Sequence, residues 1–366
     1  MIISIVCYLL LAISIWYVPA RLKALLKLRR VWALRLAALA VVVGYPFLLM
    51  SSAYTSDNSV VAGLYNFWGL LFIFQVCLFL CLAAAHLAGP LLKKVPGRYV
   101  AACGIGLSLF YVGYGFINAR SFTVTSFEIP ISGLAGPVTI AHIPDLHLGS
   151  QRDEDYLRQV IETVNSRRPD LVFFNGDLVD SNIALRSELF ALFSSLEGEK
   201  YFTTGNHEFY IDTDRALNLI AKAGLRILRN EMVETHGVQL IGLEYMNADR
   251  LTHDSHMVND LTIEEELPKI VRDRERPAIL VHHSPVGLQY VADGNIDLMV
   301  AGHTHGGQLF PGTVLAKIRF PLLKGLYHQG DTWFLVSQGA GTFGPWMRVG
   351  TFNEIQIITL TRAGEG

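Results

Sequence analysis

Hydrophobic positions in the first third of the chain form long uninterrupted runs. Four of them are each long enough to cross about 30 Å of hydrocarbon as a helix: Ile2–Ala20, Trp32–Met50, Val60–Leu92 and Tyr99–Asn118. Arg35 is the only charged residue inside these runs, and it lies near the start of the second one. Residues 1–120 are therefore predicted to form a transmembrane region with about four spans.

From residue 121 onwards, short apolar runs alternate with amphipathic stretches. The predicted strands are Val138–Ile143, Leu171–Phe174, Tyr201–Thr204, Val238–Leu243, Ala278–His282, Leu298–Ala301, Trp333–Ser337 and Glu354–Leu360. The predicted helices are Asp153–Ser166, Leu185–Leu196, Thr213–Ala223 and Ile263–Val271, with Asp153 and Thr213 as N-caps. Ser121–Pro137 is interpreted as a polar linker or a first hairpin. The alternation predicts an α/β domain over residues 121–366.

Charge divides the chain at the same place. Of its 366 residues, 30 are Lys or Arg and 32 are Asp or Glu; residues 1–120 hold 10 of these bases but only one acid, Asp57. The remaining 20 bases and 31 acids make the second part acidic, which argues against a nucleic-acid partner. All four cysteines lie in the apolar part, so thiol chemistry is excluded from a site in the second part.

The placement of Lys and Arg predicts a membrane topology. Basic residues gather in the loops that follow the first and third runs, whereas the N-terminus and the loop between the second and third runs have none. The positive-inside rule then puts both termini and the second domain outside the cytoplasmic (inner) membrane. A cleaved signal peptide is disfavoured because the first run has no basic n-region. A twin-arginine signal at Arg29–Arg30 is disfavoured because the pair is internal.

Polar residues follow five of the predicted strands at the point where each strand ends. They are Asp145-Leu146-His147, Gly176-Asp177-Leu178-Val179-Asp180, Gly205-Asn206-His207-Glu208, His282-His283-Ser284-Pro285 and Gly302-His303-Thr304-His305. Ligands bind outside the carboxyl ends of strands in α/β sheets, so these groups are predicted to form one site. Each group alone favours a structural interpretation, and the five in order favour a functional one.

The residue types in these groups point to metal chemistry. Histidine nitrogen with carboxylate or amide oxygen, and without thiolate, suits Zn, Fe or Mn. Two histidines at i and i+2 in a turn can serve neighbouring ions about 3.5–4 Å apart, as in two-metal hydrolases. Two divalent ions would also leave the site positive enough to attract a phosphate in an otherwise acidic domain. Two divalent metal ions are therefore the predicted cofactors.

The order of these groups resembles that of the calcineurin-like metallophosphoesterase superfamily. The strings Gly205–Tyr210 and Gly302–Gln308, and the ending with Arg348-Val349-Gly350, are similar to the bacterial membrane-associated branch of that family. The resemblance covers roughly residues 122–362 and not the apolar runs. It implies a double β-sandwich flanked by helices, in α/β/β/α layers, with two metals at its edge.

The resemblance also implies roles for individual residues. One metal would be held by Asp145, His147 and His305, a second by Asn206, His283 and His303, and Asp177 would bridge the two. His207 would be the catalytic residue beside the leaving group, while a metal-bridging hydroxide attacks phosphorus in line. Three further residues are placed outside the ligand set. Asp180 is interpreted as a partner of a ligand histidine or as an exposed turn residue, Glu208 as orienting His207, and His282 as a residue of the core or a partner of the ligands.

These features predict a membrane-anchored phosphoesterase that hydrolyses phosphate mono- or diesters. Anchoring favours a substrate at the membrane surface, such as a lipid, lipid-linked or cell-envelope phosphate. An apolar ramp would suit such a substrate, and Phe310, Pro311, Phe343, Pro345 and Trp346 are candidates for it. Two alternatives are a non-catalytic metal-binding scaffold and a transporter with a regulatory domain. The complete ligand set opposes the first, and the scarcity of ionisable groups in the apolar runs opposes the second.

Overall fold

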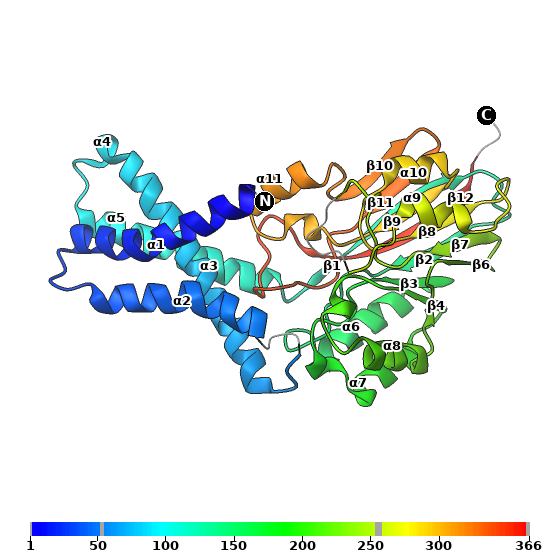
Figure 1. Cartoon of the computed structure of the whole chain (residues 1–366), viewed down its shortest axis with the longest axis horizontal. Coiled ribbons are helices and arrows are strands. Elements are labelled where there is room, and N and C mark those ends of the chain that lie inside the picture. The colour runs from blue at the N-terminus through cyan, green and yellow to red at the C-terminus, as the bar shows by residue number, and fades with distance from the viewer. Residues whose placement is uncertain (1, 52–54, 253–257, 364–366) are drawn as a thin grey trace. The chain divides into compact units, whose positions relative to one another are not determined.

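The computed structural model describes residues 2–51, 55–252 and 258–363 (Figure 1). The chain divides into two compact units. The helical unit comprises Met1–Ala53, Asn58–Arg120 and Gly344–Val349, and the sheet unit comprises Tyr54–Asp57, Ser121–Phe343 and Gly350–Gly366. The last three residues of the predicted domain 121–366 lie outside the described residues.

The helical unit contains the four predicted apolar runs as helices. They are α1 (Ile2–Leu26), α2 (Trp32–Ser51), α3 (Ser59–Leu87) and α5 (Gly97–Asn118), with a short α4 (Gly89–Leu92) between the last two. The third run was predicted to continue to Leu92, but α3 ends at Leu87. Pro90 accounts for this break, because it has no N–H to donate to the preceding turn and its ring clashes with the carbonyl of residue i−4.

Only two of these helices are shown to be long and apolar enough to cross a membrane. Among the described residues they are Ser59–Leu87 and Gly97–Asn118, while Trp32–Leu48 forms a shorter apolar helix. The prediction of four spans is thus supported for two of them, and a multi-span arrangement stays a prediction.

The helical unit also takes in a short stretch from late in the sequence. Val18, Leu22, Leu78, Leu82 and Ala101 from α1, α3 and α5 form its buried cluster. In Gly344–Val349, the Trp346 ring packs edge-on against Phe116 with centroids 5.1 Å apart. Asn118 Nδ2 donates to the Arg348 carbonyl at 3.0 Å. Pro345 and Trp346 therefore belong to this unit and not to the sheet unit.

The sheet unit is built from two six-stranded sheets. The first has the order β1-β12-β2-β3-β4-β5 and the second β10-β11-β9-β8-β7-β6. Their bounds are β1 Phe122–Ile131, β2 Val138–His142, β3 Leu171–Asn175, β4 Glu199–Thr203, β5 Arg226–Ile227, β6 Glu231–Thr235, β7 Val238–Gly242, β8 Ala278–Val281, β9 Leu298–Ala301, β10 Gly325–Gln329, β11 Thr332–Val336 and β12 Asn353–Arg362.

Alternating side chains along the strands explain why the sheets are buried on both faces. Leu171 and Phe173 of β3 point into a core shared with the second sheet, and Val172 and Phe174 point into a core with the helices. Helices α6 (Glu154–Asn165), α7 (Ser187–Ala191) and α8 (Thr213–Lys222) cover the first sheet (Figure 1). Helices α9 (Ile263–Glu266) and α10 (Leu288–Asp293) cover the second. The result is an α/β fold with two sheets between helical layers.

The predicted strands are present, but two of the predicted helices are shorter than expected. Leu185–Leu196 contains α7 followed by a 3-10 turn at Leu192–Ser195, and Ile263–Val271 contains α9 followed by a 3-10 turn at Leu267–Lys269. Ser121–Pro137 was predicted as a linker or hairpin, but it contains β1, which pairs in parallel with β12. The N-cap of α8 is Asp212 and not Thr213, because the Asp212 carboxylate accepts the Arg215 N–H at 3.2 Å. Strands β5, β6 and β10, and helices α10 and α11 (Gly312–Arg319), were not predicted.

The topology brings the polar strand ends together. In the first sheet β2, β3 and β4 run parallel, and in the second β7, β8, β9 and β11 do. The carboxyl ends of parallel strands meet at one edge of their sheet. The loops after β2, β3, β4, β8 and β9, which carry the five predicted groups, therefore converge there.

Candidate metal centre

Several residues of the site have a left-handed backbone conformation that side chains rarely adopt. Asp145, His147 and Asp177 have φ of 54°, 51° and 51°, and His303 and His305 have φ of 67° and 49°. Such conformations cost energy and persist where the surroundings enforce them, which happens frequently at functional sites. Crowding is part of that enforcement: a Cβ at Gly302 would overlap the Asp145 carboxylate. The chain thus turns sharply after β2, β3 and β9.

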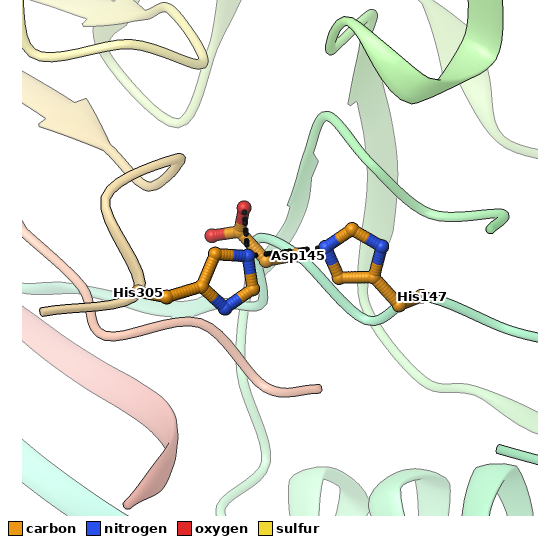
Figure 2. A group of neighbouring side chains, drawn as sticks. All are labelled: Asp145, His147 and His305. Atoms are coloured by element: carbon orange, nitrogen blue, oxygen red, sulfur yellow. Dashed lines mark hydrogen bonds and ion pairs between the residues drawn. The ribbon is translucent and has the colours of Figure 1, made fainter. Parts of the chain in front are cut away.

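Asp145, His147 and His305 form the first group of convergent ligand atoms (Figure 2). His305 Nε2 lies 3.3 Å from Asp145 Oδ1 and 3.1 Å from His147 Nε2. On its other side, the His147 ring contacts Asp180 Oδ1 through Nδ1 at 3.1 Å. An imidazole that donates Nδ1–H presents the lone pair of Nε2 to the group, as a metal-ligating histidine does.

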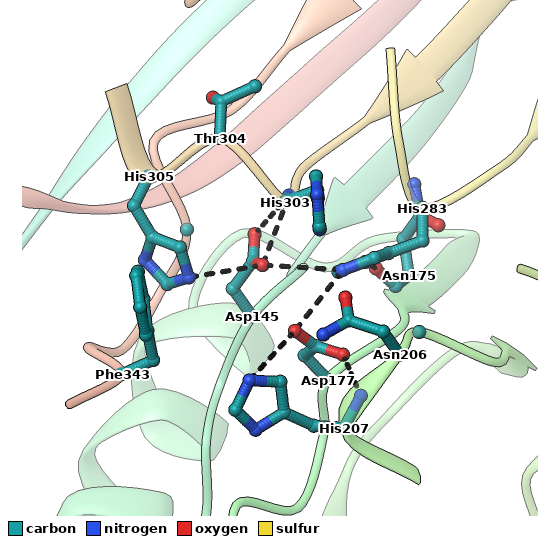
Figure 3. A network of polar contacts seen from close by, with 12 residues as sticks. Asp145, Asn175, Asp177, Asn206, His207, His283, His303, Thr304, His305 and Phe343 are labelled. Atoms are coloured by element: carbon teal, nitrogen blue, oxygen red, sulfur yellow. Dashed lines mark hydrogen bonds and ion pairs between the residues drawn. The ribbon is translucent and has the colours of Figure 1, made fainter. Parts of the chain in front are cut away.

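Asp177, His283 and His303 form a second group beside the first (Figure 3). His283 Nδ1 lies 2.7 Å from the Asn175 carbonyl, and its Nε2 lies 3.2 Å from Asp177 Oδ2. Asn206 is only 2% exposed, and its Oδ1 has no hydrogen-bond partner among the described residues. A buried carbonyl oxygen of this kind costs free energy unless it coordinates a cation or water.

His207 and Asp180 lie beside the first group, and with His147 they form a third cluster of potential ligand atoms. His207 Nδ1 contacts Asp180 Oδ1 at 3.1 Å, and its Nε2 is 3.9 Å from Asp177 Oδ2. The same Asp180 oxygen therefore contacts the rings of both His147 and His207. Asp177 Oδ1 accepts the His207 backbone N–H at 2.8 Å, which ties the loop after β4 to the loop after β3.

The electrostatics of the site call for positive charge. Burial alone would raise the pKa of Asp177, but the neighbouring His283 and His207 outweigh it and hold that pKa well below its usual range. Burial alone would lower the pKa of both histidines; facing Asp177, His283 has a pKa raised to about 10 and His207 to about 9. Protons on these rings balance the buried carboxylates when no metal is bound.

The donor set fits divalent ions. Two buried carboxylates, four ring nitrogens and one unpaired amide oxygen point inward from five loops, and no described cysteine takes part. Nitrogen and oxygen donors of this kind suit Zn, Fe or Mn. The arrangement can hold such ions and present them to an anion, because bound metal charge would exceed that of the carboxylates.

Glu208 and His282 do not join the ligand atoms. The buried Glu208 carboxylate accepts the backbone N–H groups of Asp177, Leu178, Val179 and Gly205. It was predicted to orient His207, but these bonds hold the two loops and not the ring. His282 Nδ1 lies 2.8 Å from the Ser284 carbonyl and Nε2 is 3.4 Å from the Met246 N–H, so its side chain lies in the core.

The Glu208→Gln substitution is expected to destabilise the sheet unit. The amide nitrogen that replaces one carboxylate oxygen cannot accept a hydrogen bond, so one pair of buried N–H groups loses its acceptor. Each unsatisfied group costs roughly 1–3 kcal/mol, so the free energy of unfolding should fall by about 2–6 kcal/mol. Chemical denaturation measures this. Glu265→Gln, at an exposed ion pair with Arg250, is the matched control and should change little. Equal stability of both variants would contradict the role of these bonds.

Sequence reasoning did not identify two aromatic residues beside the ligands. The Tyr245 ring packs against His283 and His303, with centroids 5.8 Å and 5.6 Å away. It follows β7, and the residues directly after this strand, 243–247, include no Asp or His that would mark a site. Tyr210 lies 5.2 Å from the His207 ring, and its hydroxyl accepts from Asn206 Nδ2 at 3.3 Å. Tyr210 ends the string Gly205–Tyr210, and this position was the sequence feature that could have identified it as part of the site.

Comparison with known proteins agrees with this geometry. The family model described as calcineurin-like phosphoesterase matches residues 138–307. An uncharacterized metallophosphoesterase of Helicobacter pylori is 32% identical over 269 residues, which cover 72% of this chain and 69% of that protein. An uncharacterized metallophosphoesterase of Aquifex aeolicus is 30% identical over 254 residues, which cover 68% of this chain and 94% of that protein.

A third relative extends the similarity toward the N-terminus. A protein of Bos taurus named transmembrane protein with metallophosphoesterase domain is 28% identical over 338 residues, covering 87% of this chain and 75% of that protein. Three observations agree. The family model matches, two relatives are at least 30% identical over more than two thirds of their length, and the fold has two sheets. The chain belongs to the calcineurin-like metallophosphoesterase family.

Proposed function

We propose that this protein is a membrane-anchored phosphoesterase with two divalent metals, which hydrolyses phosphate mono- or diesters. The observation that carries the proposal is the convergence of two Asp/His groups around the unpaired Asn206 oxygen and the His283 Nε2 atom (Figure 3). Nitrogen and oxygen donors that converge from several loops on one place are what a metal-dependent hydrolase needs.

Each ligand is assigned from its position in the two groups. Asp145, His147 and His305 would hold one metal, and Asn206, His283 and His303 would hold the other. Asp177 would serve both metals, because its Oδ2 lies 3.2 Å from His283 Nε2 in one group and 3.8 Å from His147 Nε2 in the other. When bound, the two ions polarise a phosphoryl oxygen and acidify a water.

The chain's own residues supply the remaining chemistry. His207 faces the groups with Asp180 behind it, at 3.1 Å from its Nδ1. This contact holds the ring with Nε2 toward the metals and stabilises its charged form. His207 therefore protonates the leaving oxygen of the ester, or stabilises the charge that develops on it. Asp180 is a positioning residue, since it acts through His207 and His147.

Anchoring in the cytoplasmic membrane is the second part of the proposal. Helices α3 and α5 are each long and apolar enough to span a bilayer. Two relatives, from Danio rerio and Bos taurus, are named transmembrane proteins. The loops that follow α1 and α3 hold basic residues, which favours a cytoplasmic location for them and an extracytoplasmic sheet unit.

The experiment that tests the proposal uses the full-length protein in detergent, stripped of metals and reloaded with Mn, Fe or Zn. The substrate panel contains aryl monoesters, aryl diesters, nucleotide-sugar diphosphates and phospholipids. Turnover restored by metal supports the proposal. Metal binding without turnover of any member would favour the scaffold alternative, and absence of metal binding would contradict the centre itself.

Replacing His207 by alanine is expected to lower turnover by about 10²–10⁴-fold without removing the metals. The loss should be largest for an alkyl phosphate and smallest for a nitrophenyl phosphate, whose leaving group needs no proton. Steady-state kinetics with both esters, alongside metal analysis, measures this. His236→Ala, at an exposed ion pair with Glu199, is the control. An equal loss for both esters would contradict a proton-donating role.

A further inference from the structure

Helix α11 is exposed although it is apolar. It begins four residues after Gln308, at the end of the string that carries His303 and His305. Every residue of α11 is at least partly exposed. Ile318 is 70% exposed, Val314 56% and Leu315 44%, and Phe310 just before the helix is 55% exposed. Such a contiguous apolar surface on a folded unit marks a binding surface.

The apolar and basic residues of α11 are sorted around its axis. With about 100° per residue, Val314, Leu315 and Ile318 share one face, and Lys317 and Arg319 flank that face on either side. The opposite side carries Thr313 and Ala316, which pack so closely on Gly307 that a Cβ there would overlap them. Residues 309–324 contain no acid. This is the arrangement of a helix that lies in a membrane interface, with cations at the level of the headgroups.

The same surface is joined to the metal centre. The Gln308 side chain donates from Nε2 to the Phe343 carbonyl at 2.9 Å, and its Oε1 accepts the Phe343 N–H at 3.3 Å. This pair of bonds holds the Phe343 ring 5.0 Å from His305 and 6.4 Å from His207. Phe343 is 43% exposed, so it forms an apolar wall of the site that is open to the outside.

Charge and chain composition identify the occupant. A protein-binding surface places aromatic residues at its centre and excludes lysine from it, whereas here aliphatic side chains lie between two cations. Anionic phospholipids complement both features, because their headgroups pair with the cations and their acyl chains take up the aliphatic face. The chain itself carries helices that are apolar enough to span a bilayer.

We infer that α11 with Phe310 is a docking surface for an anionic phospholipid bilayer, and that it presents the metal centre to phosphate esters carried by membrane lipids. The docking does not require hydrolysis, whereas the lipid substrate class rests on the proposed function. Pro345 and Trp346 take no part in the surface, because they pack within the helical unit.

Spin-label accessibility tests the docking in the full-length protein. Cys7, Cys77, Cys81 and Cys103 are replaced by serine, a label is placed at Ile318→Cys, and the protein is reconstituted in phosphatidylglycerol or phosphatidylcholine nanodiscs. A label at Val271→Cys, which is 90% exposed in a loop of the sheet unit, is the matched control. We expect the label at 318 to be reached by oxygen and protected from a water-soluble nickel chelate, more so in the anionic nanodiscs.

The outcomes of this measurement decide between occupants. Nickel access at 318 equal to that at 271 in anionic nanodiscs overturns the docking surface. Equal protection of both labels overturns its assignment to α11. Dipolar broadening between labels on two copies would assign the face to a second copy of the chain. Lys317→Gln with Arg319→Gln should make the label at 318 shallower in anionic nanodiscs only, and an unchanged depth overturns the role of the cations.

A kinetic experiment tests the substrate class separately. The Val314→Ser, Ile318→Ser double variant is compared with Val271→Ser, using phosphatidic acid in nanodiscs and a soluble aryl phosphate. We expect the ratio of lipid to soluble turnover to fall on the order of 10-fold in the double variant only. An unchanged ratio overturns the delivery of lipid substrates. Absence of turnover with both substrates in the unsubstituted protein is a failure of the proposed function, and the label measurement still decides the docking.

Discussion

Replacing Asp177 by asparagine is expected to abolish metal-dependent hydrolysis. Asp177 Oδ2 faces both groups of ligand atoms, at 3.2 Å from His283 and 3.8 Å from His147. Asparagine keeps the size and the acceptor for the His207 N–H, but it removes the negative charge between the two cations. If this carboxylate stabilises the transition state by about 4 kcal/mol, its loss lowers kcat by roughly 10³-fold.

The Asp177→Asn experiment measures turnover of an aryl phosphate and the metal content of the same samples. Asp170→Asn is the matched control, because Asp170 also accepts a backbone N–H, from Thr139 at 2.7 Å, outside the two groups. We expect the control to keep its activity and its metals. An Asp177→Asn variant with full turnover and two metals per chain would contradict the bridging assignment.

Removing the metals by chelation is expected to abolish activity and to lower the thermal stability of the sheet unit. A ligand at about 1,000 times its Kd stabilises the folded state by about 4 kcal/mol. For a unit of this size, that loss corresponds to a fall in Tm of about 10 °C. Without metals, the buried Asp145 and Asp177 face neighbouring histidines, which hold the pKa of both carboxyls below its usual range despite their burial.

Calorimetry before and after chelation, followed by addition of Mn, Fe or Zn, measures this effect. The Asp177→Asn variant is the comparison, since a centre that binds metal weakly has little stability to lose. We expect a large reversible change in Tm for the unsubstituted protein and a small one for the variant. If metal analysis shows that removal is complete and the Tm is nevertheless unchanged, the coupling of metal binding to folding is contradicted.

The sequence predicted the elements that are defined by local patterns. Runs such as Leu171–Phe174 are short, apolar and followed by turn residues, and each of the eight predicted strands is present in the sheets. The α6 cap followed from Asp153 in the same way, since its carboxylate accepts the Tyr156 N–H. The polar groups after the strands were visible as well, because they interrupt an otherwise apolar pattern.

Elements that depend on distant partners were not predicted. Ser121–Pro137 was interpreted as a polar linker or a first hairpin, whereas its strand β1 pairs along its whole length with β12 at the other end of the domain. The Glu208 carboxylate looked like a partner for the adjacent His207. It binds backbone amides of the loop after β3 instead, because folding brings that loop within reach.

The sequence by itself determined the division into an apolar and an acidic part, the α/β class and the residue types that suit a metal centre. Composition and local periodicity suffice for these properties, because they depend on near neighbours along the chain. The tertiary structure alone decided which distant groups meet: that the Glu208 carboxylate binds the backbone of the loop after β3, and that α11 keeps an apolar face exposed. These outcomes depend on the packing of segments far apart in sequence, which no local pattern contains.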